Sequence, residues 1–113
     1  MTYKDMQNKY RQVFEFLSKN RIKDALDTLL VLTGECRNRD YRSQVESHSE
    51  TYLNILKYAF ELGDDPQKEI VYNRLIKEIM ELADDAREDI IRAHQLLNYY
   101  SLRIEPNALN EQV

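Results

Sequence analysis

Apolar residues recur at helical spacing along almost the whole chain, and the alternation typical of strands is absent. The first stripe contains Tyr3, Met6, Tyr10, Val13 and Leu17. Thr2 precedes it, and Asp5 follows Thr2 by three residues, which is close to a capping box. The run Ser18-Lys19-Asn20 interrupts the stripe, and Asn tolerates the left-handed conformation that ends a helix. The pattern therefore predicts a first helix that ends near Asn20.

The second segment, residues 21–33, is apolar over a wide arc, so we expect it to be the most buried helix. Gly34 follows it and is predicted to end it in the left-handed conformation. Residues 35–40 form a polar connection to a third helix, which begins near Asp40 or Ser43 and ends at Gly63. Its stripe contains Tyr41, Val45, His48, Tyr52, Ile55, Ala59 and Leu62.

Asp65 as N-cap with Pro66 at the first helical position predicts the start of a fourth helix. Its stripe contains Tyr72, Leu75, Ile79, Leu82, Ala86, Ile90, Ala93, Leu97 and Tyr100. Neither Gly nor Pro occurs between Pro66 and Pro106. We therefore predict one helix, on the order of 55–60 Å long. A kink near Asp84 is the alternative.

These elements predict an all-α fold, in which helical hairpins form an antiparallel four-helix bundle with a long C-terminal helix. Residues 1–104 would be one domain and residues 105–113 a polar tail. The core is predicted from the centres of the four stripes. It contains Val13, Leu17, Leu26, Leu29, Leu53 or Leu56, Leu75, Ile79 and Leu82.

The composition argues against several classes of function but does not select one. Charged residues make up 32% of the chain, but they nearly cancel to a net charge of −4, which argues against a nucleic-acid binder. No apolar run approaches the roughly 20 residues that span a bilayer, so no membrane partner is expected. The single cysteine cannot form an internal disulfide, and no signal peptide is visible, which together favour the cytoplasm.

One helical hairpin carries a resemblance to a known repeat. The run Asn20-Arg21-Ile22-Lys23-Asp24-Ala25-Leu26 resembles the turn and second-helix start of a tetratricopeptide repeat, over roughly residues 6–34. The whole chain resembles the N-terminal stretch of large uncharacterised bacterial helical-repeat proteins. That second resemblance involves Ala25-Leu26-Asp27-Thr28-Leu29, Tyr58, Asp65-Pro66 and Glu81-Leu82-Ala83-Asp84. The second resemblance implies a helical interaction module, and it raises as an alternative that this chain is a piece of something longer.

The titratable residues do not form a recognisable catalytic or metal site. His48 and His94 lack the Glu-x-x-His and His-Glu-x-x-His spacings of metal proteins, so half-buried histidines are expected. Arg37 and Arg39 lie beside Cys36 in the sequence, where positive charge would lower the pKa of its thiol, yet no partner base is identifiable. Cys36 is therefore expected to be an incidental loop or helix-end cysteine. We expect no enzyme activity, no cofactor and no metal.

Two groups of charged residues can be interpreted either as solvated surface charge or as the binding site of an oppositely charged partner. The acidic run contains Glu78, Glu81, Asp84, Asp85, Glu88 and Asp89. It is expected to be a solvated helix face, with docking of a basic partner as the alternative. The basic residues at two helix junctions are Lys19, Arg21, Lys23, Arg37, Arg39 and Arg42. They are expected to be separate surface charges, with an acidic partner or phosphate as the alternative.

The far end of the fourth helix is the predicted contact surface. The third helix can cover its partner only to about Ile90, so the next dozen residues would overhang the hairpin. This segment is apolar, and exposed apolar patches usually mark interfaces. The predicted interaction residues are Ala93, Leu96, Leu97, Tyr99, Tyr100 and Leu102. Short first and second helices folding over the segment would be the alternative explanation.

The predicted function is therefore a non-enzymatic protein–protein interaction module that binds its own copy or another protein. The first alternative is an N-terminal cap of a larger helical-repeat protein. The second is a small-ligand sensor or enzyme, which would need an enclosed cavity in the bundle core lined by His48 or His94.

Overall fold

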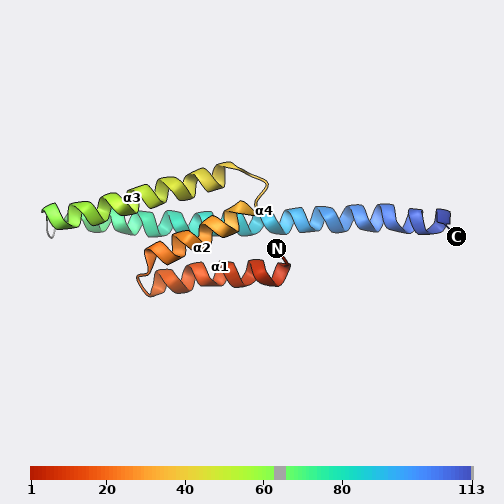
Figure 1. The fold of residues 1–113 in the computed structure, drawn as a ribbon, viewed down its shortest axis with the longest axis horizontal. Helices are drawn as coiled ribbons and strands as arrows, with labels where there is room; N and C mark the ends of the chain where they lie inside the picture. The colour runs from red at the N-terminus through yellow and green to blue at the C-terminus, as the bar shows by residue number, and fades with distance from the viewer. Residues whose placement is uncertain (63–65, 113) are drawn as a thin grey trace.

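The structure, a computed structural model, describes the backbone of residues 1–62 and 66–112 and the side chains of residues 1–58 and 66–98. This part of the chain folds into four helices without a strand, which confirms the predicted all-α class (Figure 1). The helices are α1 (Tyr3–Ser18), α2 (Ile22–Gly34), α3 (Asp40–Leu62) and α4 (Pro66–Gln112).

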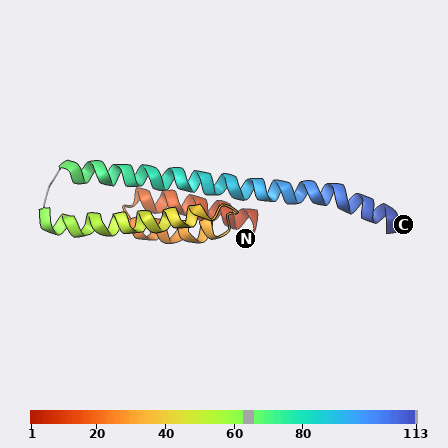
Figure 2. The ribbon, with the colours of Figure 1, turned by 90° about the horizontal axis from the view of Figure 1, so that it is seen from above.

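Successive helices run in opposite directions and close into a bundle (Figures 1 and 2). Helix α2 packs against α1 and α3, and α4 packs against α3 and α1, while α2 also touches α4 across the diagonal. Among the described residues, α1 and α3 do not touch. The arrangement is the predicted antiparallel four-helix bundle with a long last helix.

Both ends of α1 follow the sequence pattern. Thr2 and Asp5 exchange the two hydrogen bonds of a capping box. At the other end Asn20 takes the left-handed conformation with φ 60°. The Arg21 amide donates to the Phe16 carbonyl at 2.9 Å, and the Asn20 amide donates to the Leu17 carbonyl at 3.1 Å, which is the Schellman pattern.

The end of α2 differs from the prediction. Gly34 is the last helical residue, and its φ does not lie in the left-handed region. The next residue, Glu35, is the C-cap and keeps a right-handed conformation with φ −90° and ψ −7°. Its amide donates hydrogen bonds to the carbonyls of Leu32 and Thr33, so a tightened last turn ends the helix. No left-handed residue is needed here.

The core lies where α1 and α2 cover the α3–α4 hairpin. The predicted Val13, Leu26, Leu29, Leu75, Ile79 and Leu82 are buried, while Leu17 is half-buried. The choice of Leu53 or Leu56 is wrong, because these side chains are 63% and 41% exposed. Instead α3 buries Val45 and Ile55, which belong to its predicted stripe. Leu53 and Leu56 each follow a stripe position by one residue, which turns them roughly 100° away from it.

Helix α4 is one uninterrupted helix of 47 residues, so the kink near Asp84 is absent. It continues to Gln112, past Glu105 where the sequence predicted helical structure to end. The molecule measures 73 × 23 × 16 Å, and 47 residues at about 1.5 Å each account for the longest dimension. Figure 2 shows α4 continuing past the other three helices at its C-terminal end.

Candidate interaction surface

The apolar stripe of α4 continues beyond the helices that cover it. Within the bundle Leu75, Ile79 and Ile90 are at most 3% exposed. Leu97 lies seven residues after Ile90, which is two helical turns, so it belongs to the same face. Its side chain is 66% exposed. Ile90 is the last buried residue among the side chains that the structure describes, and Ile91 still packs against the core. We call residues 91–112 the overhang.

The α2–α3 connection marks one edge of the covered region. The Asp89 carboxylate accepts the amides of Arg37 at 2.8 Å and Asn38 at 3.1 Å. The Asn38 side-chain oxygen in turn accepts the amide of Asp40 at 3.0 Å, at the start of α3. These bonds hold the connection on α4 immediately before the overhang.

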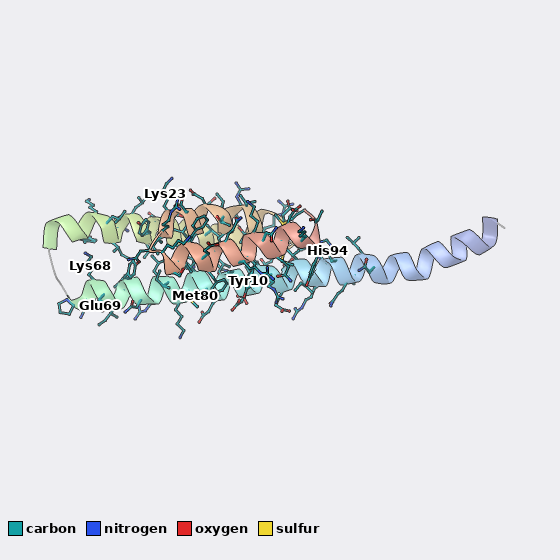
Figure 3. The ribbon with its side chains drawn as sticks, turned by 90° about the horizontal axis from the view of Figure 1, so that it is seen from below. Tyr10, Lys23, Lys68, Glu69, Met80 and His94 are labelled. Atoms are coloured by element: carbon teal, nitrogen blue, oxygen red, sulfur yellow. The ribbon has the colours of Figure 1, made fainter. Side chains whose placement is uncertain are left out.

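The start of α1 marks the other edge. The Tyr10 hydroxyl donates to the Asp84 carboxylate, and this hydrogen bond, with burial, raises the pKa of Tyr10. The Arg87 guanidinium lies 5.2 Å from the centre of the Tyr10 ring, and its Nε donates to Gln7 Oε1 at 3.4 Å. Figure 3 shows Tyr10 at the junction between α1 and α4. These contacts place the second turn of α1 beside residues 84–87, so the first turn lies beside the start of the overhang. The rest of the overhang extends past α1.

The predicted interaction residues fall on this overhang. Leu96 and Leu97 are 41% and 66% exposed, and Ala93 is partly exposed. Neither α1 nor α2 folds over Leu97. The remaining three, Tyr99, Tyr100 and Leu102, lie outside the residues whose side chains the structure describes. Their role stays a prediction.

The two histidines do not meet. His48 on α3 is 14% exposed, and its Nδ1 lies 3.7 Å from the Glu78 carboxylate on α4. His94 is partly exposed and lies level with the N-terminal end of α1 (Figure 3). Where side chains are described, no three His, Cys, Asp or Glu residues gather closely enough to hold a metal ion.

The arginines beside Cys36 in the sequence do not lower the pKa of its thiol. Burial, together with the negative charges of Asp89 and Glu35, raises the pKa of its thiol to about 12. The thiol donates to the carbonyls of Ala86 at 3.5 Å and Leu32 at 3.7 Å. Arg37 and Arg39 are exposed in the connection, where water screens their charge, so desolvation decides the direction. Cys36 is a packed thiol that bridges α2 and α4.

The acidic run serves several local contacts. Asp84 accepts the Tyr10 hydroxyl, and Asp89 holds the α2–α3 connection. Glu78 lies beside His48, and Glu81 lies 4.0 Å from Lys77 one turn earlier. Sequence reasoning treated these residues as one solvated face. It missed that Asp84 and Asp89 point to other elements, because only the packing of α1 and the connection on α4 reveals it.

The basic residues at the α1–α2 junction also have local partners. Lys19 lies 3.2 Å from Glu15, Arg21 lies 2.7 Å from Asp24, and Lys23 lies 3.6 Å from Asp27. Such exposed pairs contribute little to stability. They do, however, reduce the free positive charge available to an acidic ligand at this junction.

An open pocket of about 390 Å³ lies between the α2–α3 connection and α4. Its lining includes Arg37, Tyr41, Asp85 and Arg92, together with the Asp89 carboxylate that already accepts two amides. Charges of both signs line it and neither histidine does. This is a surface hollow and differs from the enclosed core cavity that a ligand-binding role was expected to need.

A second uncovered area lies at the opposite end of the bundle. On α3, Leu53 is 63% exposed, Leu56 41% and Tyr58 52%. The α3–α4 hairpin is longer than the α1–α2 hairpin, since α3 has 23 residues and α2 only 13. Sequence analysis assigned Leu53 or Leu56 to the core instead. Comparing the helix lengths would have revealed this uncovered tip.

Within the described part of the chain, no helix is both long and apolar enough to cross a membrane. Comparison with known proteins adds no relative: no family model, no curated protein and no solved structure matches the chain.

Proposed function

We propose that this protein is a non-enzymatic helical interaction module that associates with a second copy of itself through the overhang of α4. The observation that supports the proposal is the change in side-chain exposure along one face of α4. Ile90 is 3% exposed, whereas Leu97, two turns later on the same face, is 66% exposed.

The energetics favour covering this face. Burying a Leu side chain contributes roughly 1.5–3 kcal/mol. Leu96 and Leu97 are neighbours, and the sequence continues with Tyr99, Tyr100 and Leu102, so several apolar groups follow one another closely. Tyrosines suit interfaces because they combine apolar area with a polar tip. Exposed apolar side chains that gather in a patch usually mark an interaction site.

The chemistry of the described side chains supports a binding role better than a catalytic one. The Cys36 thiol has a pKa of about 12, so it is protonated at neutral pH and a weak nucleophile. The two histidines lie on different helices and contact different surroundings. The cytoplasm and a bacterial source remain part of the proposal, from the lone cysteine and the resemblance to bacterial repeat proteins.

The second candidate function is a cap of a larger helical-repeat protein. It is favoured by the uncovered tip of the α3–α4 hairpin, where Leu53, Leu56 and Tyr58 offer a further apolar surface for a following repeat. In that case the isolated chain would remain a monomer, and a longer chain would bury both the tip and the overhang.

Light scattering at increasing protein concentration tests the proposal. We expect the molar mass to rise from 13.5 kDa toward twice that value. Leu97→Glu should keep the chain monomeric while its helicity is retained, because a charge on the contact face opposes burial. Met80→Glu is the matched control, since Met80 is 40% exposed on the same helix and points away from the bundle (Figure 3). Wild-type protein that stays monomeric at the highest concentration would refute self-association.

A further inference from the structure

We infer that two copies pair through their overhangs in antiparallel orientation, around a two-fold axis near the middle of residues 91–112. Each overhang then lies in line with the partner's α1–α2 hairpin. It covers the apolar stripe of the partner's α4 where that hairpin no longer does. The inference rests on the proposed function and specifies the geometry of that contact.

The first argument is steric. Inside the bundle the stripe of α4 is covered by the other three helices, and the covering ends at the α2–α3 connection and the start of α1. A helix that docks on the same stripe past Ile90 lies in line with the covering helices. It has to end at the edge of the bundle, because the covering helices occupy the space beyond that edge. A parallel α4 would continue through the space occupied by α1 and α2. An antiparallel α4 runs away from them, beyond Gln112.

The second argument is the matching length. The overhang has 22 residues, from Ile91 to Gln112, and is therefore about 33 Å long. In a two-fold antiparallel pair the space beside each overhang is as long as the partner's overhang. The two overhangs can therefore face each other over about 33 Å, in an isologous contact.

The third argument is charge. Residues 91–112 carry Arg92 and Arg103 against Glu105 and Glu111, a net charge of zero, so residues 1–90 carry the whole −4. Antiparallel pairing keeps the two acidic bundles at opposite ends, whereas parallel pairing would place them side by side. Antiparallel pairing also brings the end with Arg92 toward the partner's end with Glu111, and opposes the two helix dipoles.

The face is small, about 33 Å by 10 Å on each copy or roughly 660 Å² in total, which is below the roughly 1,200–2,000 Å² of stable specific interfaces and in the range of weak contacts. We therefore expect a dimer that dissociates on dilution. The expected particle is an elongated one with a four-helix bundle at each end and two helices between them.

Distances between spin labels in the dimer test the orientation. Cys36 is first replaced by Ser, and a single cysteine is introduced at exposed Asn98 or exposed Lys77. Antiparallel pairing centred on the overhang places the two Asn98 labels roughly 15 Å apart and the two Lys77 labels roughly 75 Å apart. Circular dichroism checks that each labelled variant retains its helicity.

The possible outcomes separate this inference from the proposed function. A dimer with short distances at both positions is parallel, which overturns the antiparallel geometry while self-association through α4 stands. Oligomers that keep growing with concentration, and that Leu53→Glu dissociates, indicate head-to-tail contact with the α3–α4 tip and also overturn it. A strict monomer refutes both. A dimer with the short Asn98 and long Lys77 distances supports the inference.

Discussion

Leu29 and Leu53 show what decides the contribution of a single leucine in this bundle. Leu29 on α2 is fully buried and Leu53 on α3 is 63% exposed, although both lie in the middle of amphipathic helices. We expect Leu29→Ala to lower the free energy of unfolding by about 2–5 kcal/mol, because it removes apolar contacts and leaves a cavity. Leu53→Ala is the matched control and should change it by less than about 0.5 kcal/mol.

Urea denaturation of both variants under conditions that keep the chain monomeric measures the difference. Equal effects for Leu29→Ala and Leu53→Ala would mean that the assignment of the core is incorrect.

The Cys36 thiol gives a second prediction, about its reactivity. With a pKa of about 12 instead of its ordinary 9.0, its thiolate fraction at pH 8 is smaller by about 1,000-fold. We therefore expect a thiol reagent at pH 8 to modify the native protein far more slowly than the urea-unfolded protein. A similar rate in both states would show that the thiol is not held in the bridge between α2 and α4.

The raised pKa of Cys36 also makes the stability of the fold depend on pH. The folded state holds the thiol proton more tightly, so its contribution is complete below pH 9 and is lost as the pH rises toward 12. The stability of the wild type should fall more steeply in this range than that of Cys36→Ser, which has no thiol to ionise.

Local signals in the sequence identified several residues correctly. The capping box of Thr2 and the left-handed Asn20 depend on chemistry within a few residues, and both are confirmed. The pKa of Cys36 and the roles of Asp84 and Asp89 depend on contacts with residues 50 or more positions away in the sequence. Nothing in the local pattern encodes those contacts, which is why sequence reasoning missed them.

At the scale of elements, the helices were predictable because the apolar period is regular and the breakers are few. The buried face of α3 was predicted correctly by its stripe, while choosing Leu53 or Leu56 by residue type alone was wrong. The pattern of α4 also indicated that its apolar face continues past the end of α3, its neighbour in the hairpin. The other uncovered area, at the α3–α4 tip, required knowing that α1 and α2 end before it.

The overhang yields a prediction about α4 as an element. A chain that ends at His94 keeps every described core residue, since Ile90 is the last buried one. We expect its unfolding free energy as a monomer to match that of the full chain within about 1 kcal/mol, because an isolated helical segment adds little stability of its own. Self-association should be lost. A large drop in monomer stability would show that the overhang supports the bundle instead of serving as a contact surface.

At the scale of the whole molecule, the shape follows from one helix being far longer than the others. The radius of gyration is 19.0 Å, whereas a compact domain of this length would have about 13 Å. The excess length exposes apolar area that a compact fold would bury. Association through the overhang would remove this exposure without changing the bundle.

Hydrogen exchange at low and high protein concentration tests this account most directly. It predicts that amides of residues 93–104 exchange quickly in the dilute monomer, where one uncovered helix is only marginally stable, and become protected as copies associate. Amides of residues 75–90 should be protected at both concentrations, because the bundle already covers them. If the mass doubles while protection at residues 93–104 stays unchanged, or increases only at residues 53–58, then the overhang of α4 is not the contact surface.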